Sequence, residues 1–265
     1  MHQDSTNIAF KYTFSNGQTA YVLDAPETFT YQQSLDALGL TAPAPSMVII
    51  GGASKMSPES KARVAQLFTQ VLAPIAETYG ITVFDGGTEA GVIQMIGEAR
   101  QKIGGTFPLV GIAPKVKVHL PGYILNPNTG IESHDLTNLE KHHTHFALIP
   151  GVTWGSESPW LAHCASILAS HCPSITILIN GGKISLSDLV LNLSVGRQTI
   201  IIAGSGRLAD EIANTINGTK YSDKPMIQEL AKSYYPEQLS SFELCNSLDI
   251  LTGTLNSHFN SSVAS

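Results

Sequence analysis

The sequence predicts an α/β protein with a Rossmann-like, three-layer architecture, in which helices cover both faces of a mostly parallel sheet. Two observations lead to this prediction. Six short apolar segments rich in Val, Ile, Leu and Phe end in glycine or proline without strict alternation, the pattern of strands buried on both faces. Segments with helical apolar spacing lie between several of them, which is typical of a doubly wound sheet.

The expected strands begin with a hairpin within residues 8–24, where Asn16-Gly17 is a strong turn signal. The six apolar segments that follow are residues 46–54, 80–91, 107–114, 145–155, 174–182 and 198–206. Because these segments lack alternation, we place them in the interior of the sheet.

The expected helices have apolar residues every three to four positions. They occupy residues 58–79, 89–103, 158–170, 185–195 and 207–217. Ser57 before Pro58 is a good N-cap, and Ser158 and Ser185 are candidate caps for two later helices.

Residues 1–255 are expected to form one domain, with a core at 46–217 and a helical appendage at 225–253. Residues 115–144 are rich in Pro, Gly and Asn and predict a long irregular excursion, which in a compact domain is usually functional or a lid. The Ser- and Asn-rich end at 256–265 is expected to be disordered.

The composition argues against several classes of partner. Charged residues make up only 14% of the 265 residues, the net charge is −6, and no basic stripe is visible, so we expect no nucleic-acid partner. There is no signal peptide and no run of 18 apolar residues, so we expect no membrane insertion. Three cysteines do not make a disulfide framework, and we expect a cytoplasmic protein.

Glycine-rich turns follow most of the expected strands. In open α/β sheets, ligands bind outside the carboxyl ends of the strands, and the following helix N-termini favour anions. We therefore predict a phosphate-bearing, nucleotide-like ligand. The residues expected to bind it are Gly51, Gly52, Ala53, Gly86, Gly87, Thr88, Gly151, Trp154, Glu157, Ser158, Gly181, Gly182, Gly204, Ser205, Gly206 and Arg207.

Arg207 is the most specific of these residues, because a guanidinium after Gly-Ser-Gly can fork onto two phosphate oxygens. Two alternatives remain open at this point. The glycines can simply serve tight turns, and Arg207 can be a solvated residue paired with Asp210 or Glu211.

Known nucleotide motifs match poorly. "GSGRLA" (204–209) formally fits G-x-G-x-x-A, but it follows the last strand of the core rather than opening the first βαβ unit. Gly182-Lys183 is followed by Ile184 and lacks the upstream glycine of a Walker A motif. We therefore expect neither an NAD dehydrogenase nor a resident cofactor.

His142, His143 and His145 raise the question of a metal site. Zinc needs three or four converging ligands, and neither CxxC nor HExxH occurs. We expect no metal, and assign these histidines to hydrogen bonding under the site. No nucleophilic triad and no Gly-x-Ser-x-Gly motif is recognisable.

Several segments occur together and in order. They are "VIIGGAS", "FDGGTEAGVIQMIGEA", "VGIAP", "LEKHHTHFALIPG", "WGSESPW", "ILINGG" and "IAGSGRLADEIA". In this combination the chain resembles the prokaryotic TRPM-like (LSDAT) branch of the SLOG superfamily over roughly residues 46–213. The resemblance implies a Rossmann-like fold and a sensor of ADP-ribose or another NAD-derived molecule, with Arg207 matching a ligand-contacting arginine.

Distant relatives of this branch, the lysine-decarboxylase-like phosphoribohydrolases of the LOG type, imply an alternative. Their Pro-Gly-Gly-x-Gly-Thr-x-x-Glu motif is similar to the stretch from Pro150 to Glu157, but here the spacing differs and Val152 replaces a glycine. The sequence favours a binding protein. If it is an enzyme, we expect a nucleotide N-glycosidase with Glu157 as catalytic carboxylate.

Partner predictions follow from these two interpretations. The absence of fused membrane helices leads us to expect a separate effector protein, and dimers are common among Rossmann-like domains, so a homodimer stays open. A third interpretation is an interaction module whose pocket has lost its ligand.

Overall fold

The structure, a computed structural model, describes residues 8–123 and 136–260. The strands of its main sheet are β1 Ala9–Thr13, β2 Thr19–Asp24, β3 Ser46–Gly51, β4 Thr82–Asp85, β5 Leu109–Pro114, β8 His145–Ile149, β9 Ser174–Ile179, β10 Gln198–Ala203 and β11 Leu239–Glu243. Two short strands, β6 Val118–His119 and β7 Thr137–Asn138, pair separately.

The helices are α1 Tyr31–Ala37, α2 Pro58–Leu67, α3 Ala73–Tyr79, α4 Gly91–Ile103, α5 Ser158–Ala169, α6 Lys183–Ser194, α7 Arg207–Ile216, α8 Pro225–Tyr234 and α9 Leu248–Asn260. A π-helical turn, Phe68–Leu72, joins α2 to α3, and a 3₁₀ turn, Lys115–Lys117, follows β5.

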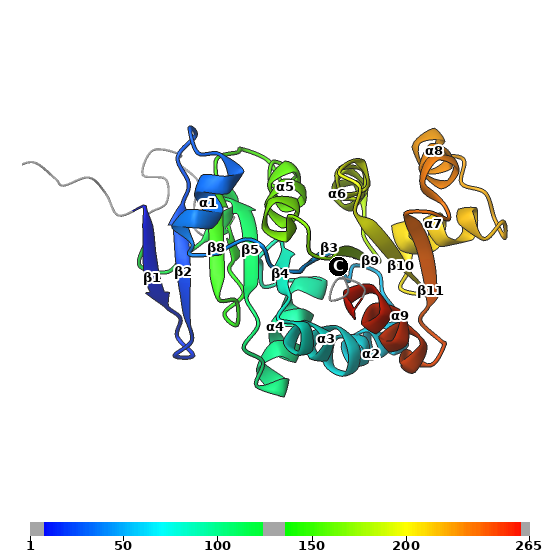
Figure 1. Cartoon of the computed structure of the whole chain (residues 1–265), viewed down its shortest axis with the longest axis horizontal. Coiled ribbons are helices and arrows are strands. Elements are labelled where there is room, and N and C mark those ends of the chain that lie inside the picture. Colours follow the sequence, from blue (N-terminus) through cyan, green and yellow to red (C-terminus); the bar gives the residue numbers. More distant parts are fainter. Residues whose placement is uncertain (1–7, 124–135, 261–265) are drawn as a thin grey trace, which may run out of the picture.

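The nine strands are ordered β1-β2-β8-β5-β4-β3-β9-β10-β11. All neighbouring pairs are parallel except β1–β2, which forms an antiparallel hairpin at the edge. Helices lie on both faces of the sheet, with α2, α3, α4 and α9 on one face and α1, α5, α6, α7 and α8 on the other (Figure 1). The predicted α/β class with a mostly parallel sheet is confirmed.

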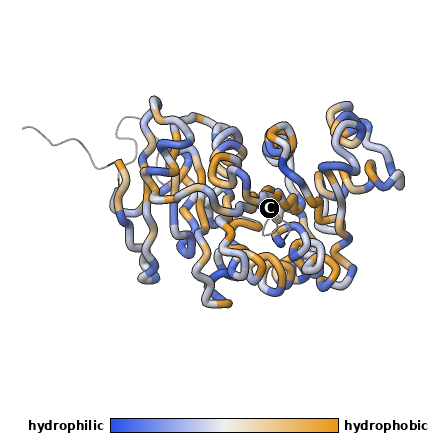
Figure 2. The backbone as a smooth tube through the Cα atoms, viewed as in Figure 1, coloured by the Kyte–Doolittle hydropathy of each residue, from blue (hydrophilic) through white to orange (hydrophobic). Residues whose placement is uncertain are grey.

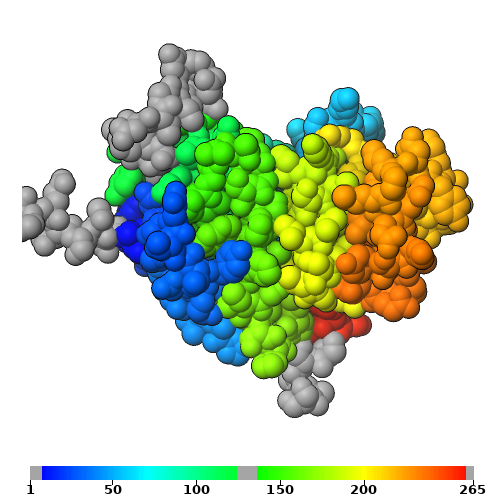
Figure 3. All heavy atoms as spheres, turned by 90° about the horizontal axis from the view of Figure 1, so that it is seen from above, coloured from blue at the N-terminus to red at the C-terminus, as the bar shows by residue number. Residues whose placement is uncertain are grey.

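The two helical layers bury opposite sides of the same strands. In β3, Met47 and Ile49 belong to the core under α2–α4, whereas Val48 and Ile50 belong to the core under α5–α8. Such burial on both faces explains the absence of alternation in the sequence. Hydrophobic residues accordingly concentrate along the inner strands in Figure 2. Figure 3 shows one face of the molecule, on which the segments of α1, α5, α6 and α7–α8 follow one another.

Several element boundaries differ from the prediction. Ser57 caps α2 as expected and accepts from the Ser60 amide at 3.1 Å. Ser158 is instead the first residue of α5. Helix α6 begins at Lys183, so Ser185 lies inside the helix, where its hydroxyl accepts a hydrogen bond from the Gly182 amide. The helix α1, which starts with a Thr30 capping box, was missed.

The C-terminal appendage is only partly helical. Residues 239–243 form β11, which pairs in parallel with β10 and extends the sheet. Helix α9 continues to Asn260, so residues 256–260 are not disordered, because Leu255 and Phe259 pack into the core beside α3. Residues 261–265, and 124–135 of the expected excursion, lie outside the described residues.

The part of the chain that the structure describes contains no helix that is both long and apolar enough to cross a membrane.

Candidate functional site

The candidate site lies where the direction of the sheet reverses. After β3 the chain turns to the α2 face, and after the neighbouring β9 it turns to the α6 face. The loops diverge at the carboxyl ends of these strands, which is where open α/β sheets bind ligands. A cleft of about 390 Å³ opens there, and we call it the central cleft.

The central cleft collects residues from five separate strand ends. Most of the predicted residues that line it are backbone-exposing glycines, and the remainder add a hydroxyl, an aromatic ring and two charges. They are Gly51, Gly52, Gly86, Thr88, Trp154, Glu157, Gly181, Gly182 and Arg207. The turns at 86–88 and 204–207, which are far apart in the sequence, thus border one hollow.

One of these glycines is required by its surroundings, and another marks a close approach of a side chain. Gly51 has φ +142°, and a Cβ there would overlap the carbonyl oxygen of Ile179 on the adjacent strand. A Cβ at Gly182 would lie 2.8 Å from Nη2 of Arg207. The Arg207 guanidinium therefore lies directly against the Gly181-Gly182 turn, and a side chain at position 182 would have to displace it.

The Arg207 side chain has no hydrogen bond or ion pair with the residues that the structure describes. Asp210 instead accepts from the Gly204 and Gly206 amides, at 2.7 and 3.0 Å. Glu211 pairs with Lys224 at 2.5 Å and accepts from the Ser222 hydroxyl. Because both acidic candidates are engaged elsewhere, the predicted alternative of an internally paired arginine is wrong for the described chain.

Arg207 also borders a second hollow of about 480 Å³, shared with Lys183 and Lys224. Lys183 lines the central cleft as well, and sequence reasoning dismissed it because the Walker A motif was incomplete. Helices α6 and α7 have Gly182 and Gly206 as N-caps. Their N-termini lie side by side, because the side chain of Arg207, the first residue of α7, lies against Gly182. Two helix N-termini and two cations make this end of the cleft electropositive.

Not all predicted residues line the central cleft. Ala53 lines an adjoining hollow of about 920 Å³, which shares Gly51, Gly52 and Thr88 with the cleft. The predicted residues outside both are Gly87, Gly151, Ser158, Gly204, Ser205 and Gly206. Ser205, for example, is buried and uses its hydroxyl internally, donating to Ile202 O at 2.6 Å and accepting from Asn180 N at 2.7 Å.

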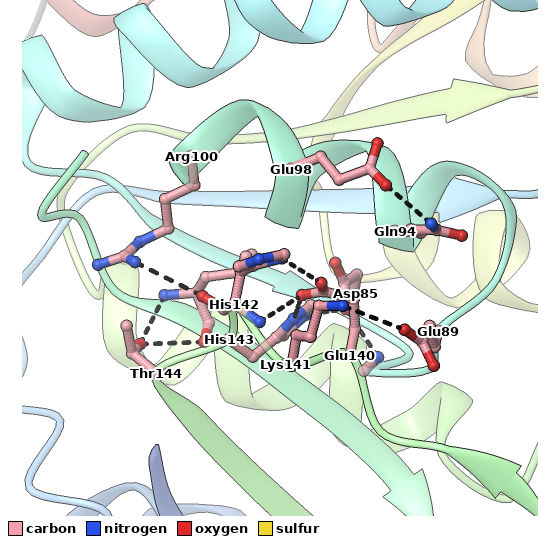
Figure 4. A network of polar contacts seen from close by, with 12 residues as sticks. Asp85, Glu89, Gln94, Glu98, Arg100, Glu140, Lys141, His142, His143 and Thr144 are labelled. Atoms are coloured by element: carbon pink, nitrogen blue, oxygen red, sulfur yellow. Dashed lines mark hydrogen bonds and ion pairs between the residues drawn. The ribbon is translucent and has the colours of Figure 1, made fainter. Parts of the chain in front are cut away.

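A buried polar network supports the glycine turn after β4 (Figure 4). The Asp85 carboxylate accepts from the Gly87 amide at 2.7 Å and contacts His143 Nε2 at 2.9 Å. His143 Nδ1 lies 2.8 Å from a Glu140 oxygen, and His142 Nδ1 lies 2.6 Å from the other Glu140 oxygen. As predicted, His142 and His143 form hydrogen bonds under the site.

The network raises the pKa of one of its histidines. Burial by itself lowers the pKa of His143, but the negative charges and hydrogen bonds of Asp85 and Glu140 outweigh burial and raise the pKa to about 9. His145, in contrast, contacts the Thr144 hydroxyl at 2.7 Å, and burial lowers its pKa to about 4. Within residues 8–123 and 136–260, no group of three or more His, Cys, Asp or Glu side chains suits a metal ion.

Two buried carboxyl groups, one at the start of α5 and one on α6, also line the central cleft. Glu157, at the start of α5, accepts from the Gly155 amide at 2.8 Å, and burial raises its pKa. Asp188, on α6, was missed by sequence reasoning, although an acid on the buried side of an apolar helix is an unusual signal. Burial, with the nearby charge of Glu157, raises the pKa of Asp188 to about 7.

Comparison with known proteins identifies relatives of the chain. The family model described as "SLOG in TRPM, prokaryote" matches residues 44–247. Two curated relatives are the transient receptor potential cation channel subfamily M member 2 of Mus musculus, 24% identical over 83% of this chain, and of Rattus norvegicus, 25% identical over 72%. The matches cover only 16% and 14% of those channels, so the chain spans about a sixth of their length.

Among solved structures, one described as the molybdenum cofactor binding protein of the phototrophic bacterium Rippkaea orientalis has a TM-score of 0.49 and 16% identity, and the match covers 82% of this chain and 98% of that one.

Proposed function

The chain belongs to the family described as SLOG in TRPM, prokaryote, and from this premise we propose that it is a sensor or binding protein for a nucleotide-derived ligand such as ADP-ribose. In this proposal the phosphates bind at the Gly182–Arg207 end of the central cleft, against the 51–52 and 86–88 turns. The remaining part of the ligand reaches toward Trp154 and Glu157.

One observation carries the proposal: an arginine without a partner among the described residues borders the same cleft as three glycine-rich strand ends. Phosphate oxygens satisfy such a guanidinium bidentately, and the N-termini of α6 and α7 add favourable partial charge. The family membership and the position at the reversal of the strand order both support a nucleotide-like ligand.

Thermal-shift measurements with ADP-ribose, NAD, cyclic ADP-ribose and AMP test this function. We expect at least one of them to raise the melting temperature, and Arg207→Ala to weaken its binding about tenfold or more, since a hydrogen bond to a charged group contributes roughly 1.5–3 kcal/mol. Arg207→Lys should restore part of the affinity. Lys232→Ala, which removes an exposed cation on α8, is the matched control. No shift at millimolar ligand would contradict the proposal.

Glu157 supports a second candidate function, hydrolysis of a nucleotide N-glycosidic bond. Its carboxyl group lines the cleft, and its raised pKa is the property of a general acid. Chromatography after overnight incubation with the same nucleotides tests this function. Free base that is released by the wild type, but not by Glu157→Gln, would favour the enzyme, and unchanged nucleotide in both samples would exclude it for these substrates.

We further propose that binding is transmitted to a separate effector protein. A homodimer is a second arrangement that the proposal accommodates. If the protein is instead an interaction module without a ligand, Arg207→Ala leaves its binding to the partner intact, whereas a ligand-dependent sensor loses the ligand response.

A further inference from the structure

We propose that Asp188, together with Glu157, forms a hydroxyl-binding subsite in the central cleft, which holds the ribose of a ligand whose phosphate lies at Arg207. The inference rests on the proposed function and adds the part of the ligand that the acidic side of the cleft recognises. Family motifs and sequence reasoning pointed to Glu157 alone.

The principal observation is an unsatisfied oxygen atom. Asp188 lines the central cleft, and the residue is only 7% exposed. Its Oδ1 is buried and has no hydrogen-bond partner among the described residues. The Ser158 hydroxyl, which does not line the cleft, lies close enough to Asp188 to lower its pKa, but it makes no hydrogen bond of good geometry among the described residues. Buried polar atoms are nearly always hydrogen-bonded, so a ligand atom that donates a hydrogen bond is the partner that is missing here.

The chemistry of Asp188 and Glu157 indicates which kind of ligand group binds them. A phosphate is repelled by two carboxyl groups and is attracted to the Lys183–Arg207 side of the cleft. Because burial raises the pKa of Asp188 to about 7, the pair of carboxyl groups can hold a proton and then both accepts and donates hydrogen bonds. A hydroxyl group also does both, whereas an ammonium or a guanidinium only donates.

The positions of α5 and α6 agree with a cleft that is basic on the phosphate side and acidic on the sugar side. Glu157 stands at the beginning of α5, Asp188 lies on the buried face of α6, and these two helices pack against each other above β3 and β9 (Figure 1). Lys183 starts α6 five residues before Asp188, which is about 1.4 helical turns. One helix therefore presents a cation to the phosphate side and an acid to the sugar side of the same cleft.

The test compares two ligands that differ only in the ribose hydroxyls, AMP and 2′,3′-dideoxy-AMP, by isothermal titration calorimetry at pH 7. Pyrophosphate, which has no sugar, reports on the phosphate end. The proteins are the wild type, Asp188→Asn, Asp188→Ala and the control Asp36→Asn, whose carboxylate is exposed on α1. Since Asp188 is buried with an unpaired oxygen, we expect both variants to keep the wild-type circular dichroism spectrum and to melt no lower.

We expect the wild type and Asp36→Asn to bind AMP at least fivefold more tightly than the dideoxy compound. In Asp188→Ala this ratio should fall to about one, while pyrophosphate binds at least as tightly as before. A ratio of one in the wild type, or an unchanged ratio in Asp188→Ala, would overturn the inference and leave the phosphate site standing. If no phosphate-bearing compound binds to any of the proteins, the proposed function fails and the hydroxyl subsite fails with it.

Discussion

At the residue scale, His143 is the side chain whose state is most strongly set by its neighbours. It is fully enclosed between Asp85 and Glu140, at 2.9 and 2.8 Å. Two carboxylates next to one imidazole favour the imidazolium, and removing one partner of such a buried group is strongly destabilising. The histidine therefore holds the turn after β4 in place through Asp85, which also binds the Gly87 amide.

This arrangement predicts a dependence of stability on pH. The pKa of His143 is about 9 in the folded chain, against 6.5 when unperturbed. Its contribution to the free energy of unfolding is therefore complete below pH 6.5 and is lost as the pH rises toward 9, by about 3 kcal/mol at 1.36 kcal/mol per unit.

Urea unfolding at pH 6.5, 8 and 9.5 measures the effect. We expect His143→Gln to be less stable than the wild type at pH 6.5 and to lose less stability over this range. His171→Gln, at an exposed position, should retain the wild-type slope. Equal slopes for wild type and His143→Gln would show that the imidazole is neutral.

At the scale of elements, the segment 137–143 acts as a strap across α4 and the turn after β4. Glu140 N donates to Gly87 O at 2.9 Å, Glu89 N donates to Asn138 O at 2.8 Å, and Thr88 forms a bridge with Leu139. Within α4, Gly97 lies against the Glu140 carboxylate, which occupies the space of a side chain. The strap reaches its position only because this helical residue is glycine.

Gly97→Ala should consequently destabilise the protein, although alanine is the better helix former by roughly 1 kcal/mol. The added Cβ would overlap the Glu140 carboxylate, and overpacking costs about 1–3 kcal/mol. Gly253→Ala in α9 is the matched control, because a Cβ there meets nothing within 4 Å. We expect a lower melting temperature for the first variant and a higher one for the second. A rise in both would mean that the strap adjusts freely.

At the scale of the whole molecule, the sheet extends beyond the glycine-ended strands on both sides. The β1–β2 hairpin adds one edge and β11 the other. Helix α9 follows the region matched by the family model, yet Leu248, Leu251, Leu255 and Phe259 are buried in the core under α2–α4. The family motifs alone therefore do not delimit the folding unit.

A chain that ends at residue 247 should not fold. Burying each of these four side chains contributes about 1.5–3 kcal/mol, and their sum is comparable with a typical total stability of roughly 5–15 kcal/mol. Circular dichroism and thermal melting compare this chain with one that ends at residue 260, which should melt like the full chain. Wild-type melting of the shorter chain would show that α9 is dispensable.

The sequence alone was sufficient for the fold class and the main strands. Continuous apolar segments such as those of β3, β9 and β10 leave no alternative to burial on both faces, and parallel strands place their carboxyl ends along one edge. For this reason the glycine turns and Arg207 were predictable as a group, and several of them do line one cleft.

Other features depend on contacts that local patterns do not encode. The short strand β11 has an alternating, partly polar sequence and becomes a strand only because β10 offers an open edge. Whether a strand-end residue faces the cleft or the interior, as Ser205 does, follows from which neighbour takes its hydrogen bonds.

Local propensity therefore determined which residues form the sheet and where its binding edge lies. Only tertiary packing decided that Asp188 and Glu157 line the same cleft. It also decided that His143 lies between the carboxylates of Asp85 and Glu140. The reason is that burial and electrostatic interaction act between segments that are distant in the chain.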